Sequence, residues 1–171
     1  AQIGAAAIAM DPRDGSILAM VSLPAFDNNE FSGGITQQNY NNYINNPDNP
    51  LFNRAIGGTY PSGSTVKLII SAAALQEKII TQRSAFLSVG GLQLGDRYFK
   101  DWKVGGHGMT NVNKALAWSV NTFFYYIGGG YGTMPGLGIE RLAGYFKKFK
   151  LDALSGIDLP SERAGFVPTP Q

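Results

Sequence analysis

Apolar residues occur along this chain in blocks that glycine, proline and polar stretches separate, and the first two blocks predict a β-hairpin. Residues 5–10 and 16–22 are apolar at nearly every position, and Asp11-Pro12-Arg13-Asp14-Gly15 between them supplies turn chemistry. Because neither block alternates polar with apolar residues, we expect helices to cover both faces of the hairpin. A lone hairpin is only marginally stable, so we also expect further strands beside it.

The central block predicts a turn followed by a helix. Pro61 and Gly63 break regular structure just before Ser64, whereas residues 65–77 contain neither glycine nor proline. From Leu68 to Leu75 the segment is apolar almost all round, which predicts a buried helix.

The other blocks predict shorter elements around long connections. Residues 24–53 are rich in Asn, Gln, Asp and Pro, and we expect an irregular connection there with Tyr40 and Tyr43 as anchors. The remaining expected elements are a short helix over 36–44, a strand with a glycine turn over 86–96, a glycine-rich loop over 101–108, a helix over 112–119 capped by Thr110 or Asn111, a helix over 122–127 ended by the glycines at 128–130, an amphipathic helix over 138–146 and an extended end from 156.

Composition indicates a globular chain, and we expect one domain over residues 1–171. Of these residues 44% are hydrophobic and 15% charged, and the net charge is +2. The only basic run lies within residues 147–150, which is too short for a nucleic-acid surface. The absence of cysteine excludes disulfides and thiolate metal sites. No stretch approaches a membrane span, so we expect any export signal or anchor to lie outside this chain.

Ser64 and Lys67 form the first chemical motif, Ser-x-x-Lys. Their spacing places both side chains on one face of a helical turn. A lysine at the edge of an apolar core loses hydration, which increases the fraction of molecules in which its amine is neutral. The neutral amine can act as a base toward the serine hydroxyl. On spacing alone, a helix-capping serine followed by a lysine that extends to solvent explains the pair equally well.

Ser119 and Asn121 form a second fragment, Ser-x-Asn, at the predicted junction of two helices. Caps for the second helix would explain these residues too. A chain of this composition produces either fragment by chance, so neither identifies a site alone.

Together and in this order, the two fragments resemble the transpeptidase domain of class B penicillin-binding proteins, most closely the elongation type. Ser-x-x-Lys, Ser-x-Asn and Lys-Thr-Gly are the signature of this superfamily. The resemblance runs over essentially the whole chain, through residues 9–22, 53–55, 60–67, 101–108, 119–125 and 156–162.

The resemblance implies an α/β (α+β) fold of the penicillin-binding and serine β-lactamase type, with the hairpin in its central antiparallel sheet and the helices in a helical subdomain. Ser64 looks like the acylated nucleophile, and its backbone N–H like one donor of the oxyanion hole. Lys67 looks like the base, Ser119 like a proton relay, and Asn121 like the residue that holds Lys67 and the substrate amide. Ser64, Ser119 and Asn121 are therefore also expected to contact substrate.

The implied activity is that of a peptidoglycan D,D-transpeptidase that cross-links stem peptides ending in D-Ala-D-Ala, is acylated by β-lactams and needs no cofactor. The implied location is the bacterial cell envelope, on the periplasmic side of the inner membrane, with the anchor outside this chain. A glycosyltransferase and proteins of the elongation complex are the implied partners of the full-length protein. A β-lactamase, or a non-catalytic penicillin-binding or sensor module, is the alternative.

The third motif of the family is missing, because no lysine here is followed by Thr-Gly or Ser-Gly. We therefore expect an incomplete transpeptidase domain that carries the catalytic nucleus without its substrate clamp. Weak or no turnover in isolation, and an exposed sheet edge prone to association, follow from that expectation.

Two further sets of residues have open roles. His107 is the only histidine, and with Asp96 and Asp101 nearby it leaves a weak metal site conceivable, although we favour a loop role and expect no metal. Trp102 and Trp118 either line the active-site groove or pack in the core. We count Trp102 among the expected substrate-binding residues.

Overall fold

The computed structural model describes residues 4–170, which form two compact units. The first unit holds the described residues up to Tyr60 together with Gly156–Arg163. The second holds Pro61–Ser155 together with the described residues from Ala164 onward. The sequence pattern gives no sign of this division, and a single domain over residues 1–171 stays a prediction.

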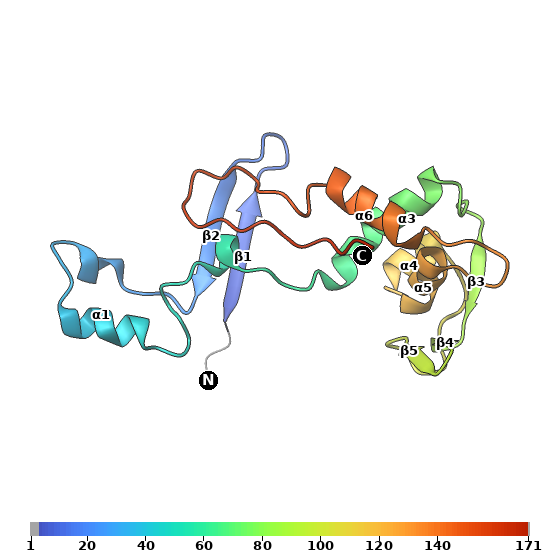
Figure 1. Ribbon diagram of the computed structural model, residues 1–171, viewed down its shortest axis with the longest axis horizontal. Coiled ribbons are helices and arrows are strands. Elements are labelled where there is room, and N and C mark those ends of the chain that lie inside the picture. The colour runs from blue at the N-terminus through green and yellow to red at the C-terminus, as the bar shows by residue number, and fades with distance from the viewer. Residues whose placement is uncertain (1–3, 171) are drawn as a thin grey trace. The chain divides into compact units, whose positions relative to one another are not determined.

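The first unit is built on the predicted hairpin. Strands β1 (Ala5–Met10) and β2 (Ile17–Leu23) pair antiparallel, with Ala5 opposite Leu23 (Figure 1). The turn closes through hydrogen bonds of 2.8 Å from Asp11 N to Ser16 O and from Gly15 N to Asp11 O. Gly15 has a φ of +83°, a conformation that glycine adopts without steric strain. The hairpin prediction is confirmed.

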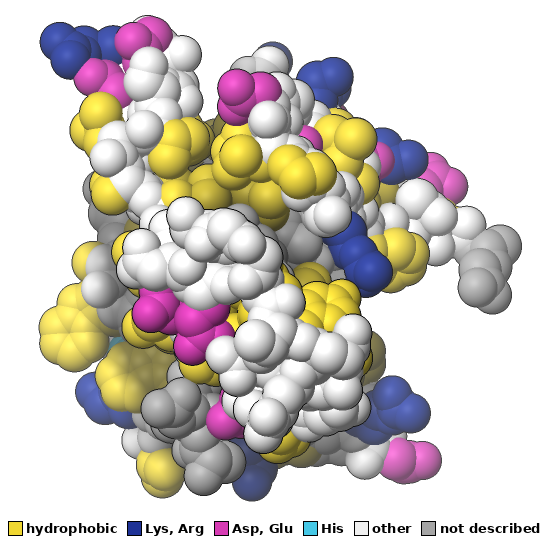
Figure 2. All heavy atoms as spheres, turned by 90° about the vertical axis from the view of Figure 1, so that its left-hand side faces the viewer, with side chains coloured by type: hydrophobic (Ala, Val, Ile, Leu, Met, Phe, Trp, Pro, Cys, Tyr) yellow, Lys and Arg dark blue, Asp and Glu magenta, His cyan; other side chains and the backbone are white. Residues whose placement is uncertain are grey.

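The expectation that helices cover both faces of the hairpin is wrong for residues 4–170. Leu18 is 69% exposed and Met10 is 56% exposed. The helix that packs on both strands is α2 (Arg54–Gly57), and its single turn cannot cover two faces. Figure 2 shows apolar side chains exposed at the surface, with acidic and basic side chains scattered among them.

The long connection of the first unit contains η1 (Asn28–Phe31) and the expected helix, α1 (Gln37–Ile44). Thr36 caps α1 by accepting a hydrogen bond of 3.2 Å from Asn39 N. The rings of Phe26, Phe31 and Tyr43 pack with centroids 5.3 to 6.2 Å apart. Tyr43 is thus an anchor as expected, whereas Tyr40 is 41% exposed and lies outside this cluster.

The second unit combines helices with two small β-ribbons (Figure 1). Its helices, in chain order, are η2 (Gly63–Val66), α3 (Lys67–Gln76), α4 (Val112–Ala117), α5 (Asn121–Gly129) and α6 (Gly138–Lys148). Its strands are β3 (Ala85–Ser88) paired with β6 (Gly108–Asn111), and β4 (Gly91–Leu94) paired with β5 (Arg97–Lys100). The sequence pattern missed β5 and β6 as strands.

The core of the second unit lies between α3, α4 and α5. Phe123 and Ile127 of α5 are at most 1% exposed. The expectation that α3 is buried all round is wrong, because Leu68 is 66% exposed. One face of α3, with Lys67, Ser71, Ala73 and Ala74, is buried. Among the described residues no helix has the length and apolar character that a membrane span requires.

Caps mark two further helix boundaries. Asn111 caps α4 through a hydrogen bond of 3.0 Å from Lys114 N, as predicted. Gly130 is the C-cap of α5, and its φ is +101°.

Replacement of Phe123 by alanine should lower the free energy of unfolding by about 3–5 kcal/mol, because it leaves a cavity in a closely packed core. The matched control is Val104→Ala, since Val104 is 97% exposed and its loss should change stability by less than about 0.5 kcal/mol. Urea unfolding followed by circular dichroism measures both. Equal stability of the two variants would contradict this description of the core.

Candidate active site

The buried amine of Lys67 joins two separate parts of the second unit. Lys67 is the first residue of α3, whereas Ser119 and Asn121 lie at the junction of α4 and α5. Lys67 Nζ donates to Ser119 O at 2.8 Å, to Ser119 Oγ at 2.9 Å and to Asn121 Oδ1 at 2.6 Å. Three of the four residues expected from the sequence therefore meet around one nitrogen.

Ser64 joins this group through a second hydroxyl. Ser119 Oγ donates to Ser64 Oγ at 2.8 Å, so the hydrogen-bond path from Ser64 to Lys67 passes through Ser119. The side chain of Ser64 lies at the surface, where a substrate can reach it. An exposed hydroxyl connected to a buried amine can act as a nucleophile with a base behind it.

A single tight turn explains why Ser64 and Lys67 lie on one side. The segment Gly63–Val66 is a 3₁₀ helix, and Lys67 N donates to Ser64 O. In a 3₁₀ helix, side chains three residues apart lie nearly above one another. The spacing of Ser-x-x-Lys therefore matches this turn, which leads directly into α3.

Ser119 adopts an unusual backbone conformation. Its φ is +52°, in the left-handed region that costs a residue with a Cβ about 1 kcal/mol. The chain reverses there between α4 and α5, with Val120 N bonded back to Ala115 O at 3.0 Å. This reversal brings both the carbonyl and the hydroxyl of Ser119 within reach of Lys67.

Burial also governs the charge of the site. Loss of hydration lowers the pKa of the Lys67 amine, while the negative charge of Asp101 partly offsets this by raising it. The ring of Phe124 lies 5.2 Å from Nζ and contributes a cation–π contact. A lysine with a lowered pKa is neutral in a larger fraction of molecules at neutral pH, which is the form that can accept a proton.

Asp101 is a second buried charge near the start of α5. Its Oδ2 accepts from Thr122 N at 2.8 Å and from Thr122 Oγ1 at 2.6 Å, and Trp102 N donates to its Oδ1 at 2.8 Å. Burial raises the pKa of this carboxyl, but the hydrogen bonds from Thr122 and Trp102 outweigh burial and hold the pKa below its usual value. The sequence had indicated Asp101 only as part of a weak metal candidate.

The two tryptophans lie beside the site at the surface. Trp102 is 59% exposed, and its Nε1 donates to Trp118 O at 3.0 Å. Trp118 is 53% exposed and directly precedes Ser119. His107 is buried between their rings, with centroids 5.0 Å from Trp102 and 6.1 Å from Trp118. In residues 4–170 no three His, Cys, Asp or Glu side chains group as a metal site would need.

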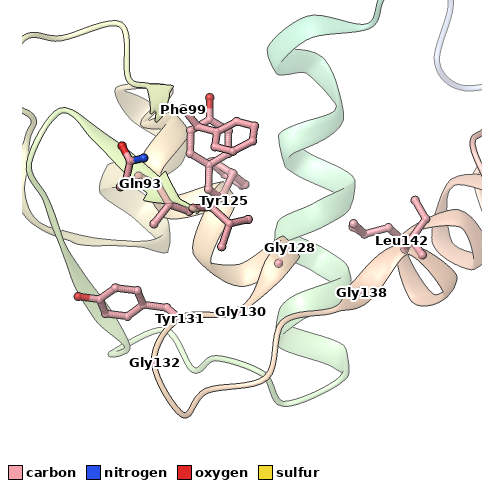
Figure 3. Close-up of a pocket in the computed structure, with 14 residues that line it drawn as sticks. Gln93, Phe99, Tyr125, Gly128, Gly130, Tyr131, Gly132, Gly138 and Leu142 are labelled. Atoms are coloured by element: carbon pink, nitrogen blue, oxygen red, sulfur yellow. The ribbon is translucent and has the colours of Figure 1, made fainter. Parts of the chain in front are cut away.

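A separate apolar pocket of about 650 Å³ lies between β4, β5, α5 and α6. Figure 3 shows the side chains of Gln93, Phe99 and Tyr125 toward one end of this pocket, and that of Leu142 toward the other. Ser64, Lys67, Ser119 and Asn121 are not among its lining residues. The pocket is therefore distinct from the polar group around Lys67.

Comparison with known proteins gives a consistent result. Residues 5–171 match the profile of the family described as penicillin binding protein transpeptidase domain. The peptidoglycan D,D-transpeptidase MrdA of Escherichia coli K12 is 40% identical over 167 residues, which are 96% of this chain and 25% of that protein. The chain thus spans about a quarter of the length of this curated relative.

Solved structures agree with the sequence match. The penicillin-binding protein PBP2 of Helicobacter pylori superimposes with a TM-score of 0.87 at 33% identity, over 96% of this chain and 30% of that one. PBP2 of the same organism in a complex with MreC gives a TM-score of 0.84 at 33% identity, over the same shares.

The Lys67 amine should titrate at a lower pH than an ordinary lysine, since burial disfavours its ammonium form. A ¹³C NMR titration of the lysine Cε resonances measures this, and the Lys67→Met variant identifies the signal by its disappearance. A midpoint at or above that of free lysine would show that the amine is not desolvated in solution.

Proposed function

Because the chain belongs to the penicillin-binding protein transpeptidase family, we propose that it carries the acyl-transfer centre of a peptidoglycan D,D-transpeptidase. The predicted family and the predicted fold class are both confirmed by the comparisons. The observation that carries the proposal is the hydrogen-bond path from the exposed Ser64 through Ser119 to the buried Lys67. We propose that residues 1–171 are part of one such domain.

In the proposed first step, Ser64 Oγ attacks the carbonyl carbon of the penultimate D-Ala of a stem peptide. Its proton passes through Ser119 to Lys67 Nζ. The bond to the terminal D-Ala then breaks, and that amine leaves with a proton returned along the same path. Ser64 is left as an ester, the acyl-enzyme.

In the second step, an amine of a neighbouring stem attacks the ester carbonyl and gives its proton to the relay. The new amide is the cross-link, and Ser64 regains its hydroxyl proton. A β-lactam would stop the sequence after acylation, because opening of its ring forms the same ester without releasing a leaving group.

The hydrogen-bond pattern is compatible with both protonation states of Lys67. In the ammonium state Nζ donates to Ser119 Oγ, and Ser119 Oγ donates to Ser64 Oγ. In the neutral state the two hydroxyls can reverse, so that Ser64 donates to Ser119 and Ser119 donates to the amine. Rotation of the two hydroxyl hydrogens prepares the proton transfer. During attack the Ser64 proton passes to Ser119 Oγ while the Ser119 proton passes to Lys67 Nζ, which becomes the ammonium.

The remaining groups support this chemistry. Asn121 Oδ1 orients Lys67 at 2.6 Å, and the other atoms of its amide are available to a substrate. We propose that the Ser64 N–H donates to the developing oxyanion. The exposed ring of Trp102 is proposed as a substrate contact beside Ser119.

One relative supports a proposal about partners and location. A solved structure holds PBP2 of Helicobacter pylori with MreC. We propose that the protein carrying this chain works in the bacterial cell envelope, on the periplasmic side of the inner membrane. There it would pair with an MreC-like protein and a glycosyltransferase.

Intact mass spectrometry after incubation with a penicillin tests the proposal. We expect one penicilloyl adduct on the wild-type chain and none on Ser64→Ala. Ser119→Ala should acylate about a hundredfold or more slowly, because the proton path is broken. Ser62→Ala is the matched control, since Ser62 is also exposed and makes no side-chain cap.

An adduct that persists in Ser64→Ala would refute Ser64 as the nucleophile. Rapid release of the adduct as hydrolysed penicillin would identify a β-lactamase instead of a transpeptidase.

A further inference from the structure

The segment between β5 and β6 contributes only the proposed substrate contact of Trp102 to the reaction above, yet it also buries two ionisable side chains near the site. Asp101 is 8% exposed and His107 is 7% exposed. Burying ionisable groups is costly unless other groups compensate them. The groups that contact Asp101 and His107 therefore indicate the role of each side chain.

Asp101 supplies the cap that α5 lacks locally. Val120 occupies the N-cap position of α5 and makes no side-chain cap hydrogen bond. The first N–H groups of a helix have no partner within the helix. Asp101 Oδ2 meets one of them by accepting from Thr122 N at 2.8 Å, and it accepts from Thr122 Oγ1 at 2.6 Å. Thr122 directly follows Asn121, which holds Lys67.

The buried ring of His107 packs beside the Asp101 carboxylate. Its Nε2 lies 3.7 Å from Asp101 Oδ1, and neither ring nitrogen has a hydrogen-bond partner among the described residues. The backbone N of His107 donates to Ser88 O at 3.1 Å. A Cβ on the preceding Gly106 would overlap that same carbonyl, so the close approach requires glycine.

We propose that Asp101 is a positioning residue of the active site, which fixes the start of α5 so that Asn121 and Ser119 hold Lys67 Nζ, and that His107 keeps Asp101 in place. This inference rests on the proposed function. It gives a role to Asp101 and His107, which the acyl-transfer steps leave unused.

The charge of Asp101 adds a second effect, because it favours the ammonium form of Lys67. The ionisable groups that face Asp101 are Lys67 of α3, His107 of its own loop and Tyr125 of α5, whose phenol pKa is raised by burial and by Asp101. Asp101 thus positions the residues that hold Lys67 and partly offsets the effect of burial on the pKa of its amine.

Two substitutions separate these effects in the full chain. Asp101→Asn keeps an oxygen for Thr122 but removes the charge, whereas Asp101→Ala removes both. Asp96→Asn is the control, since it makes the same charge change at an exposed position of the β4–β5 turn. The measurements are the rate of acylation by a penicillin as a function of pH and the NMR titration of Lys67. Circular dichroism verifies that each variant is folded.

Both Asp101 variants should shift the Lys67 titration to lower pH, because a nearby negative charge is lost. Asp101→Ala should also slow acylation about a hundredfold at every pH, because Asn121 is no longer held in place. Asp101→Asn should slow it less, and Asp96→Asn should change neither property. Dialysis of the wild-type protein against a chelator should leave acylation unchanged.

Wild-type acylation in Asp101→Ala, or an unshifted Lys67 titration in both variants, would overturn the inference. Loss of wild-type acylation after chelation would also overturn it, because a metal would then hold the loop. If the wild-type chain is not acylated at all, the proposed function fails. The NMR shifts of the Asn121 side-chain amide then still decide the positioning role, because Asp101→Ala should move them and Asp96→Asn should not.

Discussion

The burial of the Lys67 amine is the constraint on which the second unit depends. A buried ammonium must have hydrogen-bond acceptors, and all three of those it uses come from Ser119 and Asn121, more than fifty residues further along the chain. The start of α3 is therefore tied to the junction of α4 and α5 by one side chain. Packing of α3 against α5 around Phe123 brings these ends together, and the hydrogen bonds then fix their register.

Two buried charges of opposite sign surround the first turn of α5. Lys67 bonds to Asn121 on one side, and Asp101 bonds to the adjacent Thr122 on the other. Each charge meets neutral dipoles rather than the other charge. Such an arrangement keeps the region electrically balanced while leaving the amine free to lose its proton, which a direct ion pair between the two would oppose.

Sequence reasoning succeeded where the signal is local. Thr36 and Asn111 precede helices because their side-chain oxygens cap nearby N–H groups. The Asp and Gly residues between β1 and β2 predict the turn there. Strands β5 and β6 were missed because they are four-residue segments that mix polar and apolar side chains, stabilised by pairing with partners that no local pattern reveals. The exposure of Leu68 was missed because an apolar run does not show which neighbours exist to cover it.

The residues of the site could be predicted from the sequence, but the hydrogen bonds that join them could not. The Ser-x-x-Lys spacing indicated that Ser64 and Lys67 share a face, and the resemblance brought in Ser119 and Asn121. The path from Ser64 to Lys67 through Ser119 required three-dimensional structure, because it depends on how α4 and α5 meet. The cap that Asp101 provides for α5 had no sequence signal either, since it comes from a loop twenty residues upstream.

Residue 119 must meet two requirements that conflict: a left-handed backbone, which favours glycine, and a side-chain hydroxyl, which glycine lacks. Glycine would relax the backbone there, yet it would delete the hydroxyl that lies between Ser64 and Lys67. Because that hydroxyl is also one of the three acceptors of the buried Lys67 ammonium, glycine would ease the backbone while taking a partner from a buried charge. Residue 119 is therefore a position where the hydrogen-bond path between Ser64 and Lys67 and the stability of the second unit require the same hydroxyl.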